Sequence, residues 1–137
     1  MKVEQTRDLE TCRALRRAVF IEEQGVAEAE EWDDLDGEAT HFLGWQDDRP
    51  VATARVFRNG DTGKIGRVCV LADARGTGAG ASIMLAAIAA LRDDGVRQVK
   101  LSAQTHALPF YERLGFVAYG PEYPDAGIPH RDMVLEL

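Results

Sequence analysis

Apolar residues near the start of the chain recur at helical spacing. Between residues 8 and 23 they fall close to the 3.6-residue period of one helix face, which predicts an amphipathic helix over this stretch. These apolar positions are Leu9, Cys12, Leu15, Val19 and Phe20. Residues 28–38 follow with many carboxylates around Trp32 and no clear period, so we expect an irregular loop or a short helix there.

The pattern then changes to short apolar runs of strand length. Such runs cover residues 41–46, 51–57 and 65–71 and are separated by turn signals. The sequence "DDRP" joins the first two runs, and "RNGD" supplies an Asn-Gly turn before the third. We therefore expect three antiparallel strands.

The second half of the chain alternates strand and helix patterns. The third run leads through a glycine-rich loop into a helix over residues 80–94 and then a strand over residues 99–103, a β-α-β order that implies parallel pairing. A short helix over residues 106–114 follows, and strands at "FVAY" and "RDMVLEL" flank a Pro/Gly-rich loop, "GPEYPDAGIPH". These elements predict one α/β (α+β) domain over residues 1–137, with a mixed and mostly antiparallel sheet.

Composition and charge limit the classes of partner that we expect for this protein. The chain has 137 residues, of which 45% are hydrophobic, as is typical of one globular domain. Its net charge of −7 and pI near 4.9 argue against nucleic acid as a partner and would suit a cationic acceptor. We find no apolar stretch suited to a signal peptide or a membrane span, so we expect a cytoplasmic protein without a membrane partner.

The sequence offers few candidates for metal or redox chemistry. Cys12 and Cys69 lie far apart without a CxxC or His-rich neighbourhood, so neither a zinc site nor a disulfide is indicated. Gly37 at position six of a calcium loop would place Trp32 first and Leu43 twelfth, and these side chains do not bind calcium. We expect no metal, and we interpret the acidic segment as a solvated rim, with attraction of a cationic acceptor as a second interpretation.

The loop "ARGTGAGA" places three glycines two residues apart between a strand and a helix. Such glycines let backbone N–H groups converge beside a helix N-terminus, which suits a phosphate or pyrophosphate. A P-loop is excluded because no Gly-Lys-Ser/Thr follows. Gly76, Gly78 and Ala81 satisfy the dinucleotide pattern G-x-G-x-x-G/A, but no acidic ribose partner follows about twenty residues later. Arg75, Gly78 and Gly80 fill a third pattern, Arg-x-x-Gly-x-Gly.

With this third pattern the sequence resembles the GCN5-related N-acetyltransferases (GNAT), which bind the acyl-CoA pyrophosphate on such a loop. A second motif, "QTHALPFYERLGF", is similar to the family's Asn-x-x-Ala-x-x-x-Tyr-x-x-x-Gly-Phe helix, with Ala107, Tyr111, Gly115 and Phe116 in register. Gln104 stands where the broad family usually has Asn. The segments "FIEEQGV", "DLDGEATH", "AQTHA" and "DAGIPH" are similar to an uncharacterised bacterial subgroup, so the likeness covers nearly the whole chain.

The resemblance implies a fold and a cosubstrate. The expected fold is a GNAT-like twisted sheet with helices on both faces and a central β-α-β unit that binds acetyl-CoA. The strand before the loop is expected to splay from the next parallel strand, so that its backbone groups reach the pantetheine amides. The residues expected to bind acetyl-CoA are Val68, Cys69, Val70, Arg75, Gly76, Thr77, Gly78, Ala79, Gly80, Ala81 and Gln104.

The resemblance also implies transfer of an acetyl group to a primary amine by direct attack in a ternary complex. A backbone N–H near Val70 is the expected donor to the thioester carbonyl. Tyr111 is the expected general acid, because a phenol with a pKa of about 10 stays protonated at neutral pH and can protonate the leaving thiolate. Without the family, Tyr111 beside Phe110 would more simply pack its helix on the sheet.

Several residues are candidates to bind the amine or accept its proton. Acceptor sites in the family open between the first helix and the final hairpin loop, where the titratable candidates are Glu22, Glu23, Asp36, His41, Asp125 and His130. His130 is expected in that loop, where a histidine titrates near neutral pH. His41 more simply makes a structural hydrogen bond, and Glu23 has the alternative of a solvated helix end.

Two other functions compete with the transferase. A non-catalytic acyl-CoA-binding module would share the loop without needing Tyr111 as an acid, and a nicotinamide-binding domain would explain only the dinucleotide match. The family often dimerises through sheet edges, so a homodimer is one expected state. Two nearby residues have structural interpretations: we expect Arg67 to cross to a carboxylate and Cys69 to be a small apolar core residue.

Overall fold

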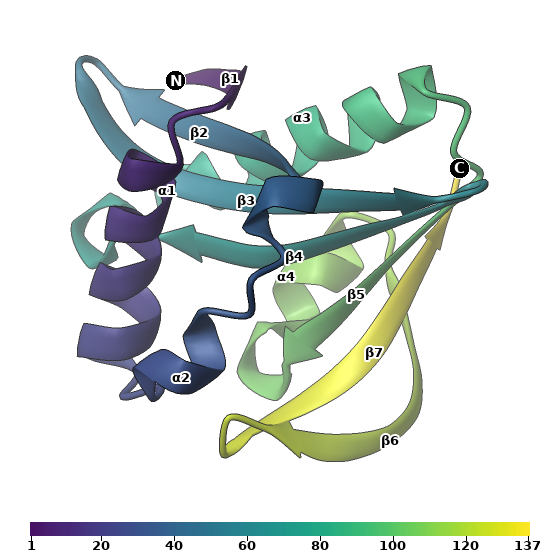
Figure 1. Ribbon diagram of the computed structural model, residues 1–137. Coiled ribbons are helices and arrows are strands. Elements are labelled where there is room, and N and C mark those ends of the chain that lie inside the picture. Colours follow the sequence, from purple (N-terminus) through teal and green to yellow (C-terminus); the bar gives the residue numbers. More distant parts are fainter.

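The computed structural model describes residues 1–137 as a seven-stranded sheet with helices on both faces (Figure 1). The strands are β1 (Lys2–Thr6), β2 (Thr40–Gln46), β3 (Arg49–Asn59), β4 (Thr62–Val70), β5 (Gln98–Gln104), β6 (Val117–Asp125) and β7 (Ile128–Glu136). The α-helices are α1 (Leu9–Arg16), α2 (Glu28–Glu31), α3 (Ala79–Asp93) and α4 (Leu108–Arg113). The other helical segments are the π-helical η1 (Arg17–Glu23) and the 3-10 turns η2 (Asp36–Glu38), η3 (Ala72–Ala74) and η4 (Thr105–Ala107).

The strand order is β1-β2-β3-β4-β5-β7-β6, and every neighbouring pair is antiparallel except β4 and β5. The predicted mixed, mostly antiparallel sheet with a β-α-β crossover is therefore confirmed. The helix predicted over residues 8–23 is also present. It changes from α-helical to π-helical geometry at Arg17, a difference that hydrophobic spacing does not reveal.

The structure corrects three of the predicted elements. The first strand, β1, was not expected, because it is an edge strand whose pairing with β2 uses backbone groups and whose residues are mostly polar. The turn in "RNGD" has Gly60 and Asp61 at its centre, since Asn59 still pairs with Thr62. The expected Pro/Gly-rich loop is mostly strand, because β6 lies at the sheet edge, where proline is tolerated.

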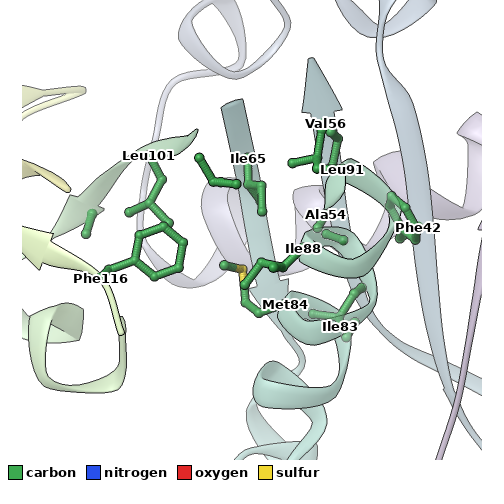
Figure 2. Close-up of a cluster of buried hydrophobic side chains, with 14 of the residues drawn as sticks. Phe42, Ala54, Val56, Ile65, Ile83, Met84, Ile88, Leu91, Leu101 and Phe116 are labelled. Atoms are coloured by element: carbon green, nitrogen blue, oxygen red, sulfur yellow. The ribbon is translucent and has the colours of Figure 1, made fainter. Parts of the chain in front are cut away.

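Helices pack on both faces of the sheet. In Figure 1, α1 lies in front of the sheet and α3 behind it. Behind the sheet is the larger core of 19 buried hydrophobic residues (Figure 2), to which α3 contributes Met84 and Ile88 and β4 contributes Ile65. The smaller core under α1 consists of Cys12, Leu15, Val19, Leu43 and Cys69. Cys69 is therefore a core residue, as predicted.

None of the helices has both the length and the apolar character that crossing a bilayer requires.

Candidate active site

The parallel strands β4 and β5 pair only at their beginnings. Residues 62–64 of β4 pair with residues 98–100 of β5, and no pairing continues beyond them. Figure 1 shows the two strands diverging from that point. The later part of β4, including Val68 and Val70, therefore has no strand partner on its β5 side, which agrees with the splay that the resemblance predicts.

A β-bulge in β4 lies where the strands diverge. Gly66 pairs with Arg55 and Cys69 pairs with Thr53, so two residues of β4 face a single residue of β3. The bulge includes Arg67, whose φ of 51° is unusual for a residue other than glycine. Bulges bend a strand and increase its twist, so this one accounts for the turn of β4 away from β5.

Acidic residues of the segment before β2 hold Arg67 in place. Arg67 Nε lies 3.0 Å from Glu31 Oε2, and Arg67 Nη2 donates to the Glu31 carbonyl at 3.1 Å. Glu31 is buried and also accepts a hydrogen bond from Arg16 Nε at 2.9 Å. Asp33 Oδ2 lies 3.3 Å from Arg67 Nη2 and also pairs with Arg55. The expectation that Arg67 reaches a carboxylate is confirmed.

Asp36 belongs to the same network rather than to an acceptor site. It accepts hydrogen bonds from Arg16 Nη1 at 2.7 Å, Arg55 Nη1 at 3.0 Å and Arg13 Nε at 3.0 Å. Burial alone would raise the pKa of Asp36, but hydrogen bonds led by that from Arg16 outweigh it and lower the pKa to about 2. His41 Nε2 lies 2.8 Å from the Asp36 carbonyl, the structural role expected for it.

The interpretation of residues 28–38 as a solvated rim is therefore wrong for two of its carboxylates. Glu31 and Asp36 are buried and paired with arginines from α1, β3 and β4. Sequence spacing did not reveal this pairing, because the partners are distant in sequence. The segment itself contains α2 and η2, in agreement with the expected short helix or irregular loop.

The backbone of Val70 faces the diverged strand. Leu71 N–H donates to the Val51 carbonyl at 2.9 Å, so these two residues form a hydrogen-bonded pair of the antiparallel ladder. Because such pairs alternate, the N–H and C=O of Val70 lie on the opposite side, toward β5. The same alternation directs the Cys69 backbone to β3. Burial raises the pKa of the Cys69 thiol to about 12, so this thiol stays protonated.

The glycine loop leads into α3 through two left-handed residues. Gly76 and Gly78 have φ values of 77° and 87°, and Gly78 is the N-cap of α3. Thr77 Oγ1 donates to the Ala74 carbonyl at 2.5 Å and accepts a hydrogen bond from Gln46 at 2.7 Å, which holds the loop against β2. Gln46 is a strand residue with no motif of its own, so the sequence gives no signal for this contact.

The first turn of α3 provides backbone N–H groups beside this loop. Ala79, Gly80 and Ala81 form that turn, whose N–H groups have no partner within the helix. A Cβ atom on Gly80 would lie 3.2 Å from Cζ of Phe110, so the glycine allows α4 to pack closely against α3. The loop and helix end thus combine free N–H groups with the positive end of a helix dipole, which suits an anionic ligand.

The end of η1 spans the diverging strands. Arg75 donates to both carboxylate oxygens of Glu23, at 2.6 and 2.7 Å, and to the Val70 carbonyl at 3.1 Å. One residue further on, Gln24 exchanges hydrogen bonds with Gln104 at 2.8 and 3.3 Å. Consecutive residues therefore contact the glycine loop after β4 and the end of β5. The contact of Gln24 with Gln104 joins residues 80 positions apart, so spacing along the chain gives no signal for it.

Tyr111 lies on α4 between two aromatic rings. Its ring centroid is 4.9 Å from that of Phe110 and 6.0 Å from that of Phe116, both in edge-on geometry. Burial raises the pKa of Tyr111 to about 12. Its hydroxyl forms no hydrogen bond with another group of the protein.

His130 lies on a strand and not in the loop where we expected it. It is buried on β7 and pairs with Gln104 of β5. Its Nδ1 lies 2.7 Å from the Ile128 carbonyl, and its ring stacks on Tyr123 with centroids 6.3 Å apart. Glu22 and Asp125 are exposed. Of the titratable candidates, the structure thus places Glu23 and His130 near Gln104.

This chain is similar to known proteins over most of its length. The profile of the acetyltransferase (GNAT) domain matches residues 7–137. YjcF of Bacillus subtilis, an uncharacterised N-acetyltransferase, is 40% identical over 123 residues, which cover 89% of this chain and 88% of YjcF. The protein ElaA of Escherichia coli is 36% identical over 128 residues, which cover 90% of this chain and 84% of ElaA.

Solved structures agree with these sequence comparisons. The crystal structure of an acyl-CoA N-acyltransferase from Pseudomonas aeruginosa matches with a TM-score of 0.84 at 32% identity, over 98% of this chain and 99% of that chain. The two chains therefore share their overall fold. Because the profile covers almost the entire sequence, this chain belongs to the GNAT acetyltransferase family.

Proposed function

We propose that this protein transfers the acetyl group of acetyl-CoA to a primary amine, by direct attack of the amine within a ternary complex. The observation that carries the proposal is the backbone of Val70, which faces the open side of the split sheet directly before the glycine loop. A linear thioester can pair with such a strand edge while its diphosphate lies at the start of α3.

Donor binding would use both strand and loop. The backbones of Val68 and Val70 would hydrogen-bond the pantetheine amides, and the N–H groups from Gly76 to Ala81 would hold the diphosphate. Arg75 would contribute its guanidinium, which in the ligand-free protein is paired with Glu23. Cys69 is not proposed to contact the donor, because its backbone is directed to β3 and its side chain is buried on the other side of the sheet from α3.

The chemical step needs a polarised carbonyl and a proton for the leaving group. The Val70 N–H would donate to the thioester oxygen and stabilise the charge that develops there. The amine nitrogen bonds to the carbonyl carbon as the carbon–sulfur bond breaks, and Tyr111 gives its proton to the thiolate. With its pKa at about 12, Tyr111 holds that proton at neutral pH and yields it to a group that becomes strongly basic only as the bond breaks.

The amine must lose a proton before or during attack. Glu23 and His130 are the proposed proton acceptors, directly or through water, because both lie near Gln104 at the end of the split. No group of three or more His, Cys, Asp or Glu side chains converges in the geometry of a metal site.

Calorimetric titration with acetyl-CoA, with NAD as the control ligand, tests donor binding first. Micromolar binding of acetyl-CoA and none of NAD is expected. Thiol release from acetyl-CoA in the presence of primary amines then tests the transfer. Binding without release for any amine would favour a non-catalytic acyl-CoA-binding module, and no binding would overturn the proposal.

A further inference from the structure

One half of the sheet has a face that no helix covers. On the front of the molecule, α1 packs on β2, β3 and β4, while β7 and β6 have no helix in front of them (Figure 1). Leu101 and Met133 of β5 and β7 are buried in the core behind the sheet. By strand alternation, the pairs Ser102 with Asp132 and Gln104 with His130 lie on the front.

A carboxylate on this face has no cationic partner. Asp132 Oδ1 accepts a hydrogen bond from the Tyr123 hydroxyl at 2.5 Å, and Ser102 Oγ hydrogen-bonds the same hydroxyl. Asp132 is partly buried, yet no arginine or lysine nitrogen lies within 4.0 Å of it. The buried carboxylates of Glu31 and Asp36, by contrast, are all paired with arginines. Asp132 thus accepts hydrogen bonds from neutral groups only, and its charge has no cationic partner within the protein.

A second bulge places Tyr123 against this carboxylate. Tyr119 pairs with Asp132 and Tyr123 pairs with His130, so three residues of β6 lie opposite one of β7. Arg131 Nε donates to the Gly120 carbonyl at 2.9 Å and holds the bulge. Bulges next to functional sites re-aim side chains, and this one brings the Tyr123 hydroxyl to Asp132 while its ring stacks on His130.

The position of Asp132 relative to the reaction centre indicates what it binds. Ser102, its partner across the strands, is two residues before Gln104 on β5, or about 7 Å along the strand. Gln104 ends β5 at the open end of the split. A group bound at Asp132 would thus lie beside the reacting amine and not in its place.

We propose that Asp132, oriented by Tyr123 and Ser102, binds a second ammonium group of the acceptor while the first amine reacts beside Gln104. The proposal rests on the proposed transferase function and names its substrate class: acceptors with a second cationic group a short aliphatic distance from the reacting amine. The ammonium would supply the counter-charge that Asp132 lacks. The stacked rings of Tyr123 and His130 would form an aromatic surface next to this ammonium.

Calorimetry with the protein saturated with coenzyme A tests this binding without requiring turnover. The probes are the diamine cadaverine and the monoamine pentylamine, which differ in the second ammonium group. We expect cadaverine to bind at least about tenfold more weakly to Asp132→Asn than to the wild type, with pentylamine unchanged. Tyr123→Phe, which removes the orienting hydroxyl, should weaken cadaverine binding to a lesser extent.

Asp48→Asn is the matched control, because it removes the same charge from the exposed β2–β3 turn. It should leave cadaverine binding unchanged. Equal cadaverine affinity for wild type and Asp132→Asn, no cadaverine binding to the wild type, or an equal loss with Asp48→Asn would each overturn the proposal.

Thiol-release assays on the same variants separate this proposal from the transferase itself. Turnover of cadaverine with no dependence on Asp132 would retain the transferase and overturn the second ammonium site. Cadaverine binding that depends on Asp132, with no thiol release for cadaverine or any other primary amine, would support the site and contradict the transferase.

Discussion

Arg75 and Glu23 form a bidentate ion pair, with Nη1 2.6 Å from Oε2 and Nη2 2.7 Å from Oε1. The pair joins the glycine loop to the end of η1. The hydrogen bonds from Arg75 lower the pKa of Glu23, so this carboxylate stays ionised at neutral pH. The arginine expected to meet a diphosphate is therefore already bound to an anion of the protein itself.

Replacing Glu23 should consequently tighten donor binding. In Glu23→Gln the diphosphate no longer competes with a carboxylate for Arg75, and acetyl-CoA affinity should rise by up to about fivefold, as an exposed ion pair is worth at most ~1 kcal/mol. Calorimetry measures this directly. Glu22→Gln, an exposed neighbour without an ion pair, should show no change, and weaker binding by Glu23→Gln would contradict competition for Arg75.

Tyr111→Phe should separate catalysis from binding. Loss of the acid should lower kcat by about 10²-fold or more, whereas acetyl-CoA affinity and thermal stability should stay near wild type, because the hydroxyl forms no hydrogen bond within the protein. Stopped-flow thiol release and calorimetry provide the two measurements. Tyr119→Phe on the exposed edge strand is the control. An unchanged kcat in Tyr111→Phe would leave Tyr111 with a packing role only.

Two substitutions at Arg67 should distinguish its backbone role from its ion pairs. Arg67→Gly and Arg67→Ala both remove the contacts with Glu31 and Asp33, but only glycine adopts a φ of 51° without strain. Arg67→Ala should therefore be less stable than Arg67→Gly by roughly 1 kcal/mol in urea unfolding, and should bind acetyl-CoA more weakly. Equal stability of the two variants would show that the bulge does not constrain this residue.

Acid should weaken the fold through Asp36. Its pKa is lowered from an ordinary 3.8 to about 2 in the folded protein, so its stabilising contribution is complete only well above 3.8, from about pH 5, and is lost as the pH falls to about 2. This contribution amounts to about 2 kcal/mol in the free energy of unfolding. Urea midpoints measured between pH 7 and pH 2 should show this loss.

Asp36→Asn provides the companion test of the buried network. At pH 7 it should cost about 3–5 kcal/mol, because Arg16 and Arg55 keep buried charges without this partner, and its stability should depend less on pH below 4 than that of the wild type. Asp34→Asn removes an exposed neighbouring carboxylate and should change little. Parallel acid curves for wild type and Asp36→Asn would contradict the assignment.

Much of the fold could be predicted because it follows from local pattern. The period of residues 8–23 identified the first helix, and the order of strand, glycine loop, helix and strand identified the parallel crossover that β4 and β5 form. The two edge strands, β1 and β6, are harder to predict from the sequence. β1 is short and polar, and the prolines of β6 suggested a loop, because edge pairing needs neither an apolar pattern nor every N–H.

Residues close together in the chain are enough to predict the glycine loop, the helix with Tyr111 and the family. The bulge at Arg67 held by Glu31 and the pairing of Glu23 with Arg75 depend instead on three-dimensional packing. The same holds for Asp132, which is left with a tyrosine and no cation. These pairings join residues far apart in sequence, and their geometry is set by how the strands twist and pack. Spacing along the chain therefore cannot reveal them.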